Sequence, residues 1–125
     1  MKRLVLSALA TVCLALGAQA QQIRVQNYEA LAARLAANRD SVILVNFWAT
    51  WCKPCVKELP AFDSLARAHA AQGLKLLLVS NDDPAMVASH VAPFLRKRGL
   101  PYEVVVIKDT NPNDWIGRVH SSWTG

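Results

Sequence analysis

Residues 42–60 have the sequence VILVNFWATWCKPCVKELP, and this stretch decides the fold. Its first part, residues 42–48, is a nearly continuous apolar and β-branched run, which is typical of a central strand buried on both faces of a parallel sheet. Residues 49–51 then turn the chain into a helix, which is predicted from about Cys52 to Gln72 and is ended by Gly73. The stretch therefore predicts a strand, a turn and a helix, with two cysteines at the turn.

The rest of the chain alternates strand-like and helix-like segments. Further strands are predicted at residues 23–26, 74–80 and 102–107. Helices are predicted at residues 28–38 after the N-cap Asn27, at 84–98 between Asp82-Asp83 and Gly99, and at 115–120. Pro60 and Pro93 lie inside two of these helices and should distort them. Strands that alternate with helices predict a layered α/β fold around one core.

The spacing of Cys52 and Cys55 indicates reversible redox chemistry. A disulfide across three sequence positions closes a small loop and removes little entropy from the unfolded chain, so it would contribute little as a staple. Cys52 is predicted at the first helical position, where unpaired backbone N–H groups and the helix dipole lower a thiol pKa. The thiolate is the attacking species in exchange, so Cys52 is the predicted nucleophile and Cys55 resolves the mixed disulfide. Pro54 suits the first turn, and Lys53 adds a nearby positive charge.

A metal site is the alternative use of such a pair. Structural zinc takes four ligands, commonly from two such pairs, and this sequence has one. His69, His90 and His120 are isolated in the sequence and are expected on helix surfaces or partly buried. The sequence therefore predicts no metal and no cofactor. A thiol-based metal or copper module remains the less favoured alternative.

Residues 1–20 have the pattern of a secretory signal peptide. Lys2 and Arg3 precede an apolar run at residues 4–17, and residues 18–20 (Ala-Gln-Ala) form a small-x-small cleavage site. The run is shorter than the ~20 residues that span a bilayer, which favours cleavage, with an uncleaved membrane anchor as the alternative. The sequence thus predicts one exported domain at residues 21–125, in which Cys52 and Cys55 are the remaining cysteines because Cys13 lies in the leader.

The charge of the chain is modest. Its 125 residues carry 14 basic and 9 acidic side chains, a net charge of +5. The densest basic cluster is Arg96-Lys97-Arg98. It falls where a helix should end, and cations at that end complement the helix dipole. We therefore predict a solvated helix terminus there and no nucleic-acid partner.

Residues 46–60 match the pattern N-F-W-A-T-W-C-x-P-C-x-x-E-x-P without a gap. With this pattern the chain resembles the thioredoxin superfamily, and within it the TlpA/ResA/DsbE group of exported thiol-disulfide oxidoreductases. The resemblance implies a thioredoxin-like three-layer α/β fold, with Cys52 as nucleophile and Cys55 as resolving thiol. It also implies that Glu58 is a partly buried acid that influences the thiol pKa and proton transfer.

The spacing of Cys55 and Glu58 in the sequence supports the implied role of Glu58 only in part. Glu58 lies three residues after Cys55, so both side chains can share one helix face, but a surface glutamate in an early turn fits the spacing as well. Thioredoxin itself has an aspartate where Asn46 stands. An amide is not a general base, so an acid–base role would fall to Glu58 or to water.

The resemblance also implies partners and a location. The expected substrates are protein disulfides and thiols, such as the haem-site cysteines of apocytochrome c, and the expected electron donor is a membrane thiol-disulfide transporter. Trp51, Lys53 and Pro54 would face the substrate, and Trp48 would lie in the core. The expected location is the periplasm or another extracytoplasmic compartment. The direction of electron flow depends on the relative stabilities of the two redox states, which the spacing does not encode.

Thioredoxin-like domains continue into a cis-proline loop, an antiparallel strand pair and a last helix, and the sequence ends at Gly125 before these elements. We therefore expect them to be missing, which would leave residues 42–48 without a neighbour strand on one side, as a long apolar sheet edge. A non-catalytic, incomplete thioredoxin-like fragment is accordingly the main alternative to a working oxidoreductase.

Overall fold

The strand predicted at residues 42–48 forms one edge of a four-stranded parallel sheet. The computed structural model describes residues 21–124, and the predicted leader with Cys13 lies outside the described residues. Strand β2 (Ile43–Trp48) pairs with β3 (Lys75–Ser80), β3 pairs with β4 (Glu103–Ile107), and β4 pairs with β1 (Ile23–Gln26).

The resulting strand order is β1-β4-β3-β2, which corrects one expectation. Within residues 21–124, β2 has β3 as its one neighbouring strand, so the expected central position is wrong and the expected open sheet edge is observed. The burial agrees with this placement. Five consecutive residues of β3 are buried, whereas β2 alternates between half-buried and buried residues at its end. An edge strand is covered less completely than a central one.

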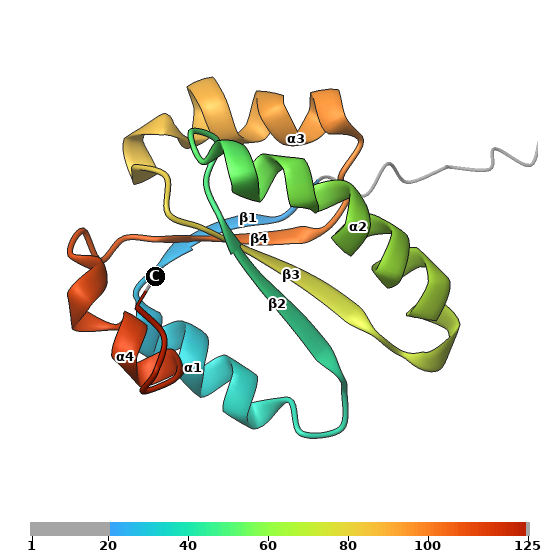
Figure 1. Cartoon of the computed structure of the whole chain (residues 1–125), viewed down its shortest axis with the longest axis horizontal. Helices are drawn as coiled ribbons and strands as arrows, with labels where there is room; N and C mark the ends of the chain where they lie inside the picture. The colour runs from blue at the N-terminus through green and yellow to red at the C-terminus, as the bar shows by residue number, and fades with distance from the viewer. Residues whose placement is uncertain (1–20, 125) are drawn as a thin grey trace, which may run out of the picture.

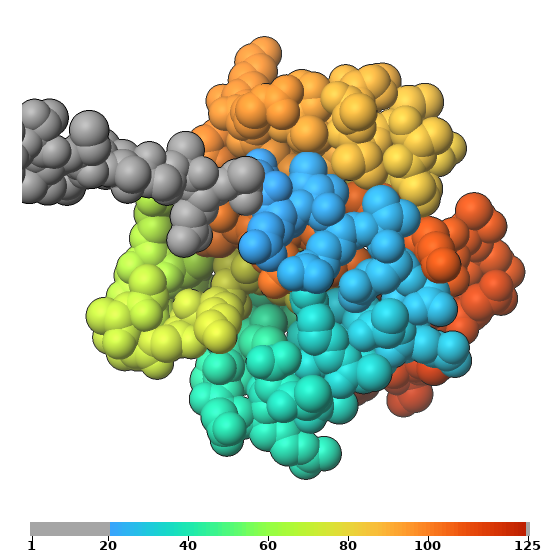
Figure 2. Space-filling view, turned by 180° about the vertical axis from the view of Figure 1, so that it is seen from behind, coloured from blue at the N-terminus to red at the C-terminus, as the bar shows by residue number. Residues whose placement is uncertain are grey.

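Helices cover both faces of the sheet, as Figure 1 shows. Helices α2 (Lys53–His69) and α3 (Ala92–Arg98) lie on one face, and α1 (Tyr28–Ala37) and α4 (Ile116–Val119) lie on the other. Figure 2 is the view from behind, with β1 and α1 on the surface in blue to cyan. The predicted three-layer α/β architecture is confirmed.

Each face of the sheet carries its own hydrophobic core, because successive strand residues point to opposite faces. On the α2 and α3 side, Trp48, Leu78 and Leu95 are among the buried residues. On the α1 and α4 side, Leu31 and Trp115 pack with alternate residues of the strands, and Phe47 of β2 lies against Trp115 and Trp123 with ring centroids 5.5 and 4.9 Å away. The C-terminal segment therefore covers this side of the edge strand.

Helix α2 begins and ends close to the predicted positions. Pro54 occupies its first turn, where the missing N–H would have had no helical partner. The α-helix ends at His69, and a 3₁₀ turn, Ala70–Gln72, completes the predicted span. Gly73 follows at φ 86°, a left-handed conformation that side chains other than glycine rarely adopt.

The helix predicted at residues 84–98 is distorted as expected. It consists of a 3₁₀ turn (Pro84–Met86), a π turn (Val87–Val91) and then α3, which Gly99 ends at φ 63°. Pro93 has no N–H to donate, and its ring excludes the carbonyl of the residue four positions earlier. The wider π turn immediately before Pro93 accommodates the missing hydrogen bond and the bulk of the proline ring.

A polar contact joins α2 to the segment that enters β4. The phenol of Tyr102 donates a hydrogen bond to the carboxylate of Asp63, which also accepts one from Nε of Arg67 at 2.9 Å. The hydrogen bonds from Arg67 and then Tyr102 lower the pKa of Asp63. Burial and then the bond to Asp63 raise the pKa of Tyr102 to about 12. The contact therefore favours a neutral phenol beside an ionised carboxylate.

We expect Tyr102→Phe to lower the free energy of unfolding at neutral pH by about 1–2 kcal/mol, because the carboxylate loses a donor. An unfolded tyrosine titrates near pH 10, so the higher folded-state pKa gives a contribution that is complete below about pH 10 and is lost as the pH rises through about 12. Urea unfolding across this pH range should show the stabilities of the two proteins converging. Tyr28→Phe is the matched control, since the Tyr28 hydroxyl makes no hydrogen bond among residues 21–124. If the difference in stability between the native protein and Tyr102→Phe stays constant up to pH 12, the hydrogen bond from Tyr102 to Asp63 does not account for it.

Candidate active site

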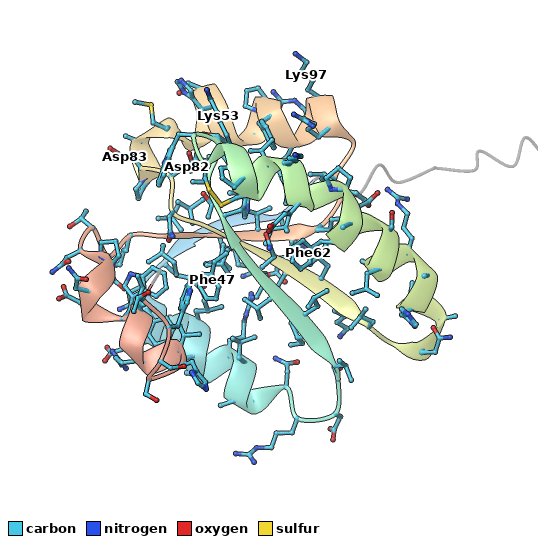
Figure 3. All side chains as sticks on the ribbon, in the orientation of Figure 1. Phe47, Lys53, Phe62, Asp82, Asp83 and Lys97 are labelled. Atoms are coloured by element: carbon cyan, nitrogen blue, oxygen red, sulfur yellow. A yellow bond between two sulfur atoms is a disulfide. The ribbon has the colours of Figure 1, made fainter. Side chains whose placement is uncertain are left out.

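The two cysteines meet where β2 ends and α2 begins. Their sulfur atoms are joined in a disulfide, and their Cα atoms are 5.3 Å apart. Figure 3 shows this bond in yellow at the start of α2. Cys52 is the N-cap of α2 and not its first helical residue, which shifts the prediction by one position. The N–H of Cys52 donates to the carbonyl of Ala49 at 3.1 Å, and the carbonyl of Cys52 accepts from Val56 at 2.9 Å, so the turn is tied at both ends.

The surroundings of Cys52 and Cys55 differ. Both are half-buried, but Cys55 packs against the core that contains Trp48 and Leu59. Cys52 is not part of either core cluster and lies between the exposed residues Trp51 and Lys53. An external sulfur atom therefore has better access to Cys52 than to Cys55.

The start of α2 provides a favourable setting for a thiolate once the disulfide is reduced. The first turn contains no acidic residue, and Lys53 stands next to Cys52. The first N–H groups of a helix lack helical partners and, together with the dipole, favour a negative charge. These features favour the thiolate of Cys52 as the attacking species.

A buried carboxylate that the sequence analysis missed holds the loop before Cys52. Asp82 is 3% exposed, and it accepts hydrogen bonds from both the N–H (3.0 Å) and the hydroxyl of Thr50. It also accepts a bond from the hydroxyl of Ser80 at 2.7 Å, and its own N–H donates to Ser80 Oγ at 3.0 Å. Asp82 thus connects the end of β3 to the loop after β2, two residues before Cys52.

The sequence analysis placed Asp82 and Asp83 together at a helix start, and only one of them has that role. Asp83 is the cap, because its side chain accepts from the N–H of Ala85 at 2.9 Å. Asp82 points inward instead, and Figure 3 shows it between Asp83 and the disulfide. An acidic residue two positions after the end of a buried parallel strand was the available signal, since the carboxyl ends of parallel strands lie at the same end of the sheet.

Asn46 is buried on the same side of β2 as Trp48. It is 8% exposed, and its side-chain oxygen has no hydrogen-bond partner among the described residues. Residues two apart on a strand share a face, so this amide lies on the side covered by α2. The buried position on this side of β2 therefore holds a neutral group.

Glu58 is exposed, so its expected partial burial is wrong. The side of α2 that packs against the core contains Cys55, Leu59 and Ala66. A helical residue turns about 100° from the one before it, so Glu58 lies about 60° to one side of Cys55, away from Leu59. The carboxylate remains within a turn of Cys55, on the solvent side. Its role in proton transfer remains a prediction.

The other predicted site residues divide into surface and core. Trp51 is 70% exposed, and Lys53 and Pro54 are exposed as well. Trp48 is 1% exposed, which confirms its place in the core. The three histidines are exposed and lie at separate positions, at the end of α2, before α3 and after α4. In residues 21–124 no three side chains of His, Cys, Asp or Glu gather in a way that could hold a metal ion.

Over residues 21–124, no helix combines the length and the apolar character that a membrane crossing requires.

Comparison with known proteins identifies several relatives. The model of the AhpC/TSA family matches residues 16–114. The thiol-disulfide oxidoreductase ResA of Geobacillus thermodenitrificans is 32% identical over 92 residues, which cover 74% of this chain and 51% of that protein. Thioredoxin of Ictalurus punctatus is 38% identical over 68 residues, or 54% of this chain and 64% of that protein. The chain thus spans about half the length of the ResA proteins that it matches.

Solved structures support the fold. A thioredoxin-like protein of Porphyromonas gingivalis aligns with a TM-score of 0.50 at 29% identity, over 68% of this chain and 54% of that one. A proposed thiol:disulfide interchange protein DsbE of Chlorobium tepidum aligns with a TM-score of 0.52 at 24% identity, over 70% of this chain and 57% of that one. Both alignments agree with a thioredoxin-like arrangement of sheet and helices.

We expect Asp82→Ala to lower the free energy of unfolding of the oxidised protein by about 2–4 kcal/mol, because donors on Thr50 and Ser80 lose their buried acceptor. Urea unfolding measures this loss. Asp83→Ala is the matched control, because it removes the same charge one residue away and only a surface cap, worth about 0.5–1 kcal/mol. Equal losses in the two variants would show that the buried carboxylate does not hold the loop.

Proposed function

This chain belongs to the AhpC/TSA family of thioredoxin-like proteins, and we propose that it is an enzyme that exchanges protein thiols and disulfides through Cys52 and Cys55. The observation that carries the proposal is the disulfide at the start of α2, with Cys52 on the accessible side and Cys55 against the core. Relatives that bear the name thiol-disulfide oxidoreductase support it.

The proposed reaction begins with the reduced protein. The Cys52 thiolate attacks one sulfur atom of a substrate disulfide, forms a mixed disulfide, and releases the other substrate sulfur as a thiolate. Cys55 then loses its proton, and its sulfur attacks Sγ of Cys52 and releases the second substrate sulfur. The substrate gains two electrons, takes up one proton from Cys55 and one from water, and becomes a dithiol. The protein ends with the Cys52–Cys55 disulfide that the structure contains.

Proton transfer at Cys55 is the step in which Glu58 is proposed to act. Its carboxylate lies three residues after Cys55 on α2 and is open to solvent, so it can exchange protons with the thiol through water. Asn46, which lies on the buried side, carries no titratable group. Of these two residues, the one with a titratable group therefore lies at the surface of α2.

The proposed direction is reduction of substrate disulfides, with a membrane thiol-disulfide transporter as the dithiol donor that regenerates the enzyme. Exported proteins are the proposed substrates, and haem-site cysteines of apocytochrome c are one example. The signal-like sequence of residues 1–20 supports an exported, periplasmic protein, with an uncleaved anchor as the alternative. Trp51, Lys53 and Pro54, which are exposed around Cys52, are the proposed substrate-facing residues.

A non-catalytic role is the second candidate, and the open edge of β2 favours it. Within residues 21–124 this apolar strand pairs with β3 alone. A chain with such an edge is expected to unfold without a sharp transition if its core is incomplete. Circular dichroism during a thermal melt separates the two functions, since a cooperative transition supports a working domain.

We expect Cys55→Ser to accumulate a mixed disulfide between Cys52 and a substrate, because the resolving thiol is absent. Nonreducing electrophoresis followed by mass spectrometry of the adduct measures this trapping. Cys52→Ser is the matched control and should trap nothing, since Cys55 is packed against the core. An adduct on Cys55 in that control would reverse the two roles.

A further inference from the structure

A groove of about 430 Å³ runs along α2 beside the disulfide. Residues of α2, of α3 and of the loop before Cys52 line it, and they are Thr50, Lys53, Val56, Lys57, Pro60 and Arg98. We call this depression the α2–α3 groove. Its lining includes Thr50 and Lys53, which bracket Trp51 and Cys52 in the sequence, so a molecule bound in it would lie near the start of α2.

The lining follows from helix geometry. Lys53, Val56, Lys57 and Pro60 are spaced i, i+3, i+4 and i+7, which puts them on one face of α2. Arg98 faces them from the last turn of α3. The floor is therefore apolar, from Val56 and Pro60, and the rim carries three cations.

These three cations differ from the four arginines that form ion pairs in residues 21–124. Arg24, Arg34, Arg67 and Arg118 each pair with a carboxylate. Lys53, Lys57 and Arg98 have no carboxylate within 4.0 Å in residues 21–124. Glu58, although it lies on the same helix, is neither in the groove nor in an ion pair there.

The orientation of Arg98 and the neighbouring charges strengthen the positive rim. The guanidinium of Arg98 lies over the ring of Phe94, 5.2 Å from its centroid, which restricts the side chain. Arg96 and Lys97 precede Arg98 in the last turn of α3 and are exposed. Figure 3 shows Lys53 at the start of α2 and Lys97 on α3. Unpaired positive charge is therefore concentrated on one side of the disulfide.

We propose that the α2–α3 groove binds an acidic segment of a substrate protein that flanks its target cysteine, an inference that rests on the proposed function. Cations around a concave site attract an anionic partner and raise its rate of association. The apolar floor can pack against the methylene groups of glutamate side chains, while their carboxylates reach the rim. The groove therefore selects among protein disulfides by the charge beside them.

The test compares three peptides with the same intramolecular disulfide, flanked on both sides by glutamate, glutamine or lysine pairs. The reduced full chain is mixed with each, and the rate of peptide reduction is measured. At about 20 mM salt we expect the glutamate peptide to react about fivefold faster than the lysine peptide, and the ratio to approach one at about 0.5 M salt, where charges are screened within a few ångströms.

Variants then test whether the faster reduction of the glutamate peptide depends on the cations of the α2–α3 groove. Lys57→Gln combined with Arg98→Gln should bring the ratio of glutamate to lysine rates at low salt most of the way to one, because two of the three rim charges are gone. Lys75→Gln is the matched control and should keep the ratio, since Lys75 is exposed at the amino end of β3, whereas the cysteine turn follows the carboxyl end of the parallel strand β2.

The outcomes distinguish this inference from the function on which it rests. If all three peptides are reduced at equal rates, or if the double variant keeps the full preference, the groove does not select acidic segments although the exchange activity stands. If no peptide is reduced and Cys55→Ser traps no partner, the proposed function itself fails, and the inference fails with it.

Discussion

Asp82 brings a carboxylate into the interior at the point where β2 and β3 end, and the geometry of the site depends on how that charge is satisfied. A buried charge is costly unless hydrogen bonds compensate it. Thr50 and Ser80 supply these bonds from two neighbouring strand ends. Because Thr50 lies two residues before Cys52, the same bonds that satisfy the carboxylate also hold the turn that presents the sulfur. The position of Cys52 is thus set by the core of the sheet and by a loop distant in sequence.

Apart from Asp82, whose carboxylate is bound by Thr50 and Ser80, the charges at the start of α2 are mainly positive. A neutral amide, Asn46, occupies the buried position under α2, and the one carboxylate of the predicted site, Glu58, lies at the surface. The first turn of α2 carries no acid, and unpaired cations line the groove beside it. This arrangement favours a thiolate at Cys52 and places positive charge where a substrate would approach. In the proposed function, the same charges would serve both the reactivity of the sulfur and the selection of its partner.

Local sequence patterns predicted where helices end and where one is distorted, because these features depend on the backbone properties of single residues. Gly73 and Gly99 end helices at positive φ, and Pro93 distorts the segment before α3, as their backbone properties require. The position of β2 at a sheet edge and the exposure of Glu58 were harder to predict from residues 42–60 alone. An apolar strand is compatible with one or two neighbours, and a residue three positions from Cys55 can fall inside or outside the buried stripe of a helix.

By itself, the sequence determined the order of strands and helices, the cysteine pair at a strand-to-helix turn, and the resemblance to thioredoxin-like oxidoreductases. These features depend on residue type and spacing along the chain. The tertiary structure alone decided which sides of the elements face each other. It turned Asp82 inward to Thr50, left Glu58 in solvent, and brought Arg98 across from Lys53 and Lys57. Such contacts join residues more than thirty positions apart, and only packing around the shared sheet brings them together.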